Sequence, residues 1–108
     1  MTNFNQPLYR HDQPVLDTSN VRRIAEHAVR VRLGPEYVAD YGIEGCVRHV
    51  HAQDDELVVI ELNSGGNALA VVAALLRSGY EVRHRTPLDY GVSLVVALGR
   101  VGPTSRGA

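Results

Sequence analysis

The longest hydrophobic run lies near the middle of the chain. Nine apolar residues follow one another without a break at positions 68–76, and Arg77-Ser78-Gly79 closes the run. A surface helix needs only one apolar stripe, so a segment that is apolar all round has to be covered on more than one side. Ser64 or Asn67 can cap its start, and Gly79 can close its end in the left-handed conformation. The pattern therefore predicts a largely buried central helix.

A second helical period precedes this one. Apolar residues recur at helical spacing between positions 21 and 31, with arginines and other polar residues between them. We expect this helix to continue to about Arg32 and to end by Gly34-Pro35, although the alternation of residues 29–33 is also typical of a strand. Residues 35–45 indicate a short helical turn followed by a loop. Three residues could cap the first helix: Thr18, Ser19 and Asn20.

Four shorter apolar runs predict two β-hairpins. The runs at 46–52 and 56–62 are separated by three residues, two of them aspartate, which is typical of a hairpin turn. The runs at 80–86 and 92–98 flank the longer segment 87–91, which indicates a hairpin with a longer loop.

The order of these elements predicts the fold. A strand, helix and strand joined tightly normally form a right-handed crossover, so we expect the second and third strands to run parallel. The fold class is then α+β: a two-layer sandwich with a four-stranded mixed sheet, in the order helix-hairpin-helix-hairpin (α-β-β-α-β-β), with the helices on one face. We expect one domain at 19–99, an extended or partly disordered arm at 1–18 and a flexible tail at 100–108.

The two hairpins resemble each other in sequence. Val47-Arg48-His49 matches Val82-Arg83-His84, 35 positions later, and Val59-Ile60 is echoed by Val95-Val96 at 36 positions. One interpretation is a duplicated helix-strand-strand unit with internal twofold symmetry. The alternative is that two hairpins rich in arginine and valine match by chance.

Composition narrows the possible functions of the 108 residues. The formal net charge of -1 argues against a general nucleic-acid binder. All eleven basic residues are arginine, which reflects either codon bias or bidentate binding of carboxylate or phosphate, and no lysine-based mechanism is possible. The N-terminal residues lack a secretory signal and no apolar run reaches membrane-spanning length, so we expect a soluble, cytoplasmic protein.

The sequence offers three candidates for chemistry. Histidines two apart on a strand can hold a metal with a third ligand, so a metal site could use His49, His51 and His84. The glycine-rich start of the central helix could bind an anion through Ser64, Gly65, Gly66 and Asn67. Each set has a structural explanation as well: exposed or hydrogen-bonded histidines, and a tight turn with its cap. Cys46 is the only cysteine, and a lone cysteine is more typical of a small core residue than of a nucleophile.

Arginines provide the candidate partner-binding surface. On the first helix we expect them on the solvent side, and on the strands we expect them on the sheet face away from the helices. The candidates are Arg22, Arg23, Arg30, Arg48, Arg83 and Arg85. Such a surface could contact an acidic protein or RNA, but aromatic residues for base stacking are not interleaved with it.

The leading hypothesis is a small non-enzymatic binding or regulatory protein that acts as a homodimer through macromolecular contacts, with a protein partner reached by its arm and arginine-bearing surface. We expect no catalytic residue and no cofactor, and no membrane association. One alternative is a small-molecule or metal-dependent enzyme using the strand histidines and the Gly-Gly anion loop. The other is a nucleic-acid-binding module, which the net charge does not favour.

Overall fold

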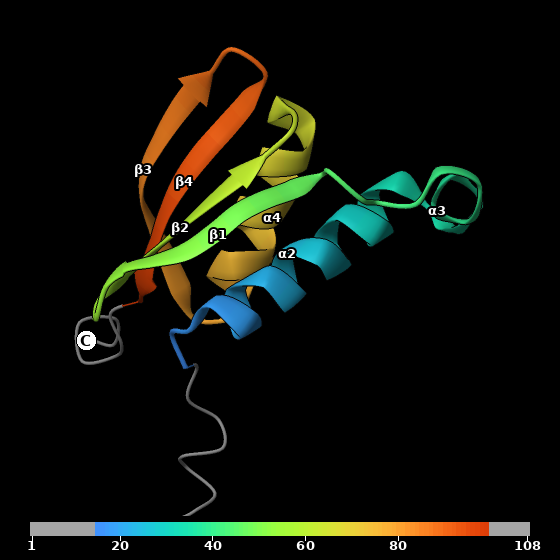
Figure 1. Cartoon of the computed structure of the whole chain (residues 1–108). Coiled ribbons are helices and arrows are strands. Elements are labelled where there is room, and N and C mark those ends of the chain that lie inside the picture. The colour runs from blue at the N-terminus through green and yellow to red at the C-terminus, as the bar shows by residue number, and fades with distance from the viewer. Residues whose placement is uncertain (1–14, 100–108) are drawn as a thin grey trace, which may run out of the picture.

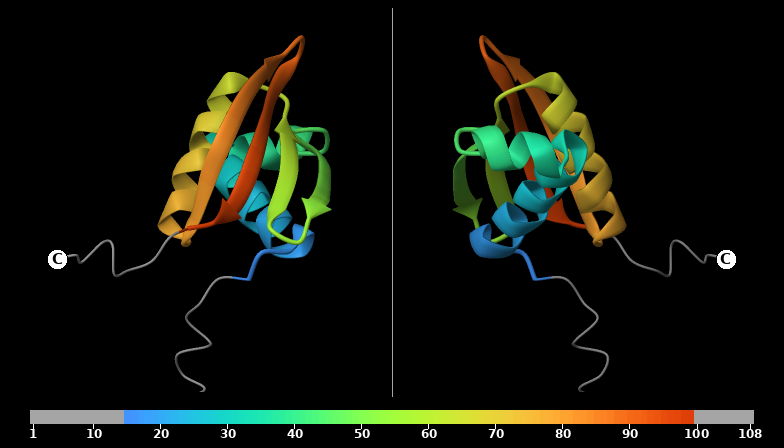
Figure 2. Two further views of the ribbon diagram at one scale, coloured as in Figure 1. Left: turned by 90° about the vertical axis from the view of Figure 1, so that its left-hand side faces the viewer. Right: turned by 90° about the vertical axis from the view of Figure 1, so that its right-hand side faces the viewer.

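Two helices cover one face of a four-stranded antiparallel sheet and leave the other face open (Figures 1 and 2). The structure, a computed structural model, describes residues 15–99. The predicted α+β class, with helices on one face and the order helix-hairpin-helix-hairpin, is confirmed. The predicted tail at 100–108 and the predicted arm up to residue 14 lie outside the described residues. No helix within 15–99 combines the length and hydropathy needed to cross a membrane.

Helix α2, Thr18–Leu33, is the predicted first helix, but its cap is not one of the predicted residues. The side chain of Asp17 accepts a hydrogen bond of 2.7 Å from the backbone N–H of Asn20, so Asp17 is the N-cap. A carboxylate also suits the positive end of the helix dipole. α2 ends as predicted just before Pro35, which occupies the first position of a short helix, α3, Pro35–Tyr41.

Helix α4, Gly65–Arg77, is the predicted central helix. Its N-cap is Ser64, whose hydroxyl accepts a hydrogen bond of 3.1 Å from the backbone N–H of Asn67. Gly79 follows the helix with a φ of 95°, in the predicted left-handed conformation. Both predicted ends are therefore confirmed.

The strands follow the predicted runs closely: β1 (Val47–Asp54), β2 (Leu57–Leu62), β3 (Tyr80–Leu88) and β4 (Gly91–Leu98). The predicted long loop at 87–91 is wrong, because only two residues separate β3 from β4. Pro87 lies within β3, which is an edge strand, and an edge strand tolerates a residue without an N–H.

The predicted mixed sheet is also wrong. The strand order is β1-β2-β4-β3, and every neighbouring pair is antiparallel. β2 and β3 do run in the same direction, as the crossover through α4 predicts, but β4 folds back between them. Hydrogen bonds therefore form only between antiparallel neighbours.

The inner strands pair about an internal twofold axis. β2 pairs with β4 at the centre, and each carries its own hairpin partner on the outside. Val59 pairs with Val95, which lies 36 positions further along the chain. The same shift relates the two neighbouring pairs, because it converts the pair Val58–Val96 into the pair Leu94–Ile60. Such a register is what a duplicated helix-strand-strand unit produces, so it supports the duplication.

The outer strands match at a different shift. β1 carries one extra residue between Arg48 and His51, and β3 carries one between Val82 and His84. These bulges are equivalent, because the first paired residue after each one lies opposite a valine on the axis. His51 pairs with Val59, and His84 pairs with Val95. Equivalent positions in β1 and β3 are therefore 33 residues apart, so the predicted correspondence at 35 positions is wrong.

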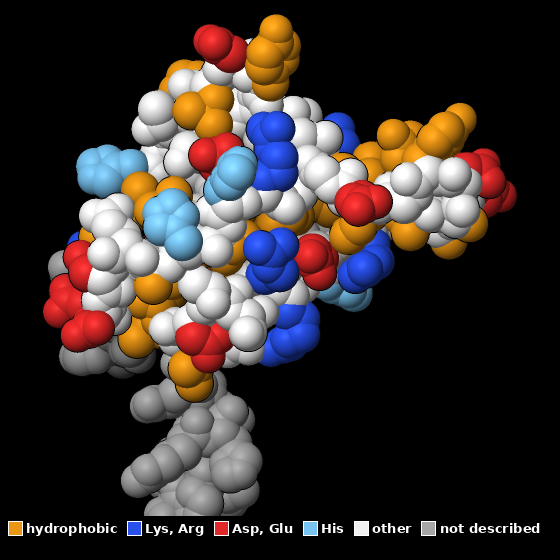
Figure 3. Space-filling model, viewed as in Figure 1, with side chains coloured by type: hydrophobic (Ala, Val, Ile, Leu, Met, Phe, Trp, Pro, Cys, Tyr) orange, Lys and Arg blue, Asp and Glu red, His pale blue; other side chains and the backbone are white. Residues whose placement is uncertain are grey.

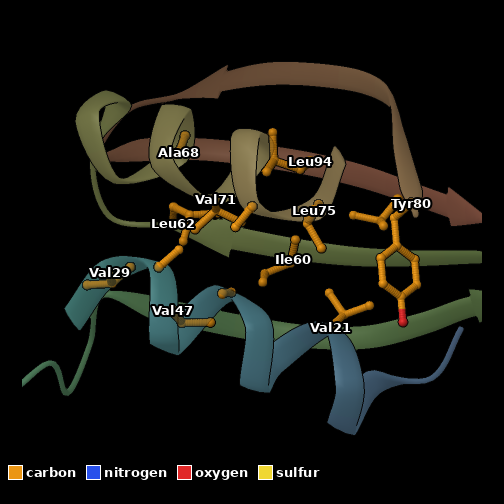
Figure 4. Packing of buried hydrophobic residues seen from close by; sticks show 14 of the residues in the cluster. Val21, Val29, Val47, Ile60, Leu62, Ala68, Val71, Leu75, Tyr80 and Leu94 are labelled. Carbon is orange, nitrogen blue, oxygen red and sulfur yellow. The ribbon is translucent and has the colours of Figure 1, made fainter. Parts of the chain in front are cut away.

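The core lies between the helices and the sheet. Side chains from both helices meet the inward-facing residues of the two central strands (Figure 4). Ile60, Leu62, Leu75 and Leu94 are completely buried there, and burial of each such side chain contributes about 1.5–3 kcal/mol. Cys46 is also buried in this cluster, which confirms it as a small core residue.

Candidate functional site

The three histidines predicted as metal ligands do not come together. His51 lies on β1 and His84 on β3, and both inner strands separate them. Three strand spacings correspond to about 14 Å, whereas a zinc ion binds its nitrogen ligands at about 2 Å. Within residues 15–99, no three His, Cys, Asp or Glu side chains are grouped so that they could hold a metal ion.

His49 lies in the bulge of β1. It has a φ of 53°, and its carbonyl oxygen is 3.1 Å from Nδ1 of His51. His49 and His51 were predicted to share a face because residues two apart do so on a regular strand. The extra residue interrupts this alternation. The local contact between these residues is therefore a feature of the bulge.

The predicted anion loop is occupied by contacts within the protein. The Asn67 side chain is buried, accepts a hydrogen bond of 2.9 Å from Nη1 of Arg32 and donates one of 2.7 Å to Oδ1 of Asn63. The Arg32 guanidinium also lies so close to Gly66 that any side chain there would collide with it. These contacts fix the end of α2 against the start of α4.

The predicted arginine surface on the sheet is divided between its two faces. Arg48 is paired with Glu61 and lies on the open face, where its Nη2 donates a 2.8 Å hydrogen bond to the carbonyl oxygen of Tyr90. Arg83, in the bulge of β3, forms an ion pair of 2.7 Å with Glu81. Arg85 pairs with the buried residue Leu94, so it lies on the helix side. The bulge reverses the alternation after Val82, and the prediction of Arg85 on the open face is therefore wrong.

The outer surface of α2 and α4, which we call the helical face, remains partly apolar. α2 lies beside α4 and covers one flank of it (Figure 2). The side of α4 that points away from the sheet is not covered, and Leu69 and Leu76 are 60% and 55% exposed. Val31 on α2 is 67% exposed. The helical face therefore exposes apolar side chains that no other part of the described residues covers.

A groove runs along the helical face between α2 and α4. It consists of two adjoining hollows that share His27, Ala74 and Arg77, and we call it the α2–α4 groove. Small and branched apolar side chains form its floor: Ile24, Ala28, Val31, Ala70, Ala73 and Ala74. Basic side chains line its rim: Arg23, His27, Arg32 and Arg77. The groove therefore offers an apolar contact surface bordered by positive charge.

Charge is segregated between the helices and the rest of the described chain. Five arginines lie on the two long helices: Arg22, Arg23, Arg30, Arg32 and Arg77. Glu26 is the one carboxylate on these helices, and it lies 3.7 Å from Arg22. Within residues 15–99, none of the three arginines on the groove rim forms an ion pair. The rim is therefore positively charged although the chain as a whole has a slight negative charge.

Helix α3 projects from the body on the side away from the sheet (Figure 1). None of its residues is buried, and Tyr37 and Tyr41 are 46% and 73% exposed. Their rings lie 4.8 Å apart between centroids, because positions i and i+4 share one side of a helix. Glu36 and Asp40 form a second such pair on the same helix. Figure 3 shows orange and red side chains on this projection and blue ones over α2.

α3 is not among the candidate sites that the sequence predicts. A helical turn is predicted at this place, but the exposure of the two tyrosines is not visible in the pattern. The signal that could have identified it is Pro-Glu-Tyr-Val-Ala-Asp-Tyr, in which the two aromatic residues and the two acidic residues are each four positions apart.

Comparison with known proteins finds no matching family model, curated protein or solved structure.

Proposed function

We propose that the protein is a non-enzymatic binding protein that forms a homodimer through its helical face and contacts a second macromolecule through the surfaces left outside. The observation that carries this proposal is the row of exposed apolar side chains on the helical face, at Val31, Leu69 and Leu76. A contiguous apolar surface with a polar rim is typical of an interaction site. A twofold dimer covers such a surface with a second copy of itself.

The same dimer leaves the open face of each sheet directed outward. Val59 and Val95 lie at the centre of that face, His51 and His84 lie at its edges, and Arg48 lies beside Glu61. The mixture of apolar and charged groups is suited to a polypeptide partner rather than to nucleic acid, because a nucleic acid requires a clear positive excess. We assign the partner contact to this face.

Sedimentation equilibrium tests the homodimer. The chain has a mass of 11.8 kDa, and we expect the wild-type protein to approach twice this value at micromolar concentration. The double variant Leu69→Glu/Leu76→Glu should remain a monomer, because four added charges would lie in the interface. Glutamate is a good helix former, so α4 itself should persist.

A matched control changes exposed apolar residues elsewhere. The variant Leu88→Glu/Tyr90→Glu introduces the same two negative charges at the β3–β4 hairpin. The two side chains replaced there are 38% and 82% exposed. It should sediment like the wild-type protein. A wild-type protein that stays monomeric up to millimolar concentration would contradict the proposed homodimer.

A further inference from the structure

The charge on the helical face works against a simple symmetric dimer. A twofold interface brings the same patch from both subunits together. Here it would bring the arginines on the groove rim of both subunits, Arg23, Arg32 and Arg77, into one interface. Like charges brought together at an interface cost free energy. Acidic groups placed between the two sets of arginines would therefore stabilise a dimer through this face.

Helix α3 carries the complementary chemistry. Its tyrosine pair offers aromatic surface of the kind that fills apolar grooves at interfaces. Glu36 and Asp40 supply two carboxylates, and within residues 15–99 neither forms an ion pair. The α2–α4 groove combines the opposite features, an apolar floor and a basic rim.

Comparison of the two halves indicates that α3 is an addition to the repeated unit. In the second half of the molecule, only two residues separate α4 from β3. In the first half, thirteen residues separate Leu33 from Val47, and they contain α3. α3 therefore has no counterpart in the second half, and it contributes no buried residue to the core. A role outside the folding of a single chain accounts for its aromatic and acidic side chains.

The position of α3 also suits an intermolecular contact. α3 follows α2 directly and extends past the helices on the side away from the sheet (Figures 1 and 2). When two helical faces approach each other, the projection on each copy is directed toward the other copy. The contact can then be made twice, once in each direction, around one twofold axis.

From these observations we infer that α3 of one copy docks in the α2–α4 groove of a second copy. The inference rests on the proposed homodimer and names the segment that fills its interface. Tyr37 and Tyr41 contact the alanine-rich floor, and Glu36 and Asp40 face the arginines of the rim. Two reciprocal contacts of this kind neutralise the positive charge that would otherwise separate the helical faces.

A charge-exchange experiment tests this inference. One full-length variant reverses α3, Glu36→Arg/Asp40→Arg, and a second reverses the groove rim, Arg23→Glu/Arg77→Glu. We expect each variant alone to have a dimer dissociation constant at least tenfold higher than that of the wild-type protein, measured by sedimentation equilibrium. An equimolar mixture should restore the dimer, because both docking contacts then bring opposite charges together. Circular dichroism checks that each variant is folded, since all four side chains are exposed.

A control variant carries the same change of charge at another exposed site. Asp55→Arg/Glu56→Arg reverses the acidic turn between β1 and β2 and should leave the dimer unchanged. If the wild-type protein is a dimer and both reversal variants dimerise equally well, the docking of α3 is wrong and the homodimer stands. If the wild-type protein is a monomer, both proposals are wrong.

A second variant keeps the inference testable if a charge reversal disturbs folding. Replacement of residues 35–41 by glycine and serine over the same length removes α3 without shortening the chain. We expect this protein to keep the circular dichroism and cooperative unfolding of the domain and to lose the dimer. A folded α3-less protein that still dimerises like the wild type would overturn the inference.

Discussion

At the scale of single residues, Tyr80 joins the entry to α2 with the end of the sheet. Its side chain is buried, and its hydroxyl donates a 2.5 Å hydrogen bond to the carbonyl oxygen of Val15. The Nδ2 of Asn20 lies within 3.5 Å of the same hydroxyl and 3.1 Å from the same carbonyl oxygen. Burial raises the pKa of the Tyr80 phenol above its ordinary value. The neutral phenol is therefore the form that the fold stabilises.

Replacement of Tyr80 should change how the stability of the fold depends on pH. Because the pKa is raised in the folded state, Tyr80 stabilises the fold fully below about pH 10 and loses that contribution as the pH rises above this value. Tyr80→Phe should cost about 1 kcal/mol at neutral pH through the lost hydrogen bond. It should also reduce the loss of stability above pH 10, measured by urea unfolding from pH 7 to 11. Equal pH dependence in both proteins would contradict this role.

Two glycines provide a matched pair at the same scale. Gly91 has a φ of 141°, and a Cβ there would collide with the carbonyl oxygen of Leu62, whereas nothing lies near the corresponding position at Gly65. We expect Gly91→Ala to destabilise the protein by at least about 1–3 kcal/mol. Gly65→Ala, in the first turn of α4, should stabilise it by about 0.4–1 kcal/mol. Urea unfolding compares the two variants, and similar midpoints would show that backbone conformation at Gly91 is not restrictive.

Single residues also show why the predicted site was only partly correct. Strand alternation places side chains correctly as long as the ladder is regular, and it fails at a bulge because one extra residue reverses the faces. His49 lies in the bulge between Arg48 and His51, and Arg85 lies beyond the one between Val82 and His84, so regular alternation does not give their faces. No glycine or proline marks either bulge, and neither could be predicted from the pattern.

At the scale of elements, the helices and hairpins were predictable because their ends carry local chemical signals. Ser64 and Gly79 identify α4, and Pro35 identifies the end of α2. The strand order was not predictable in this way. A right-handed crossover determines that β2 and β3 run parallel, but it leaves open whether β4 returns outside β3 or between the two. That choice depends on packing across the whole core.

α3 is the element whose place in the molecule was least predictable. A short segment with two tyrosines and a valine can pack against a core or project from it, and its sequence does not distinguish these outcomes. In the structure, the core contacts near it are made by Leu33 and Ile43, which lie on either side of the helix. α3 is therefore held at its two ends and leaves its own aromatic side chains exposed.

At the scale of the whole molecule, the internal symmetry relates the long helices and the strands of the two halves. Each half supplies one long helix, one inner strand and one outer strand. The inner strands are hydrogen-bonded on both sides, and the outer strands on one side only. Stability against local opening should therefore decrease from the centre of the sheet toward both edges.

Amide hydrogen exchange measured by NMR checks this pattern. We expect the slowest exchange in β2 and β4 around Val59 and Val95, with faster exchange near the bulges at His49 and Arg83. Corresponding amides of the two halves should be protected to a similar extent, within about tenfold. A half that exchanges entirely before the other would show that the halves open independently.

The paired bulges have a consequence for how copies of the protein can meet. β1 and β3 are the two edges of the sheet, and an exposed regular edge strand is a template for aggregation by strand addition. A bulge near the middle of each edge interrupts the row of backbone donors and acceptors that an incoming strand would need. Both edges are protected by the same device in the same place, so growth into open-ended β-assemblies is disfavoured while association through side chains remains available.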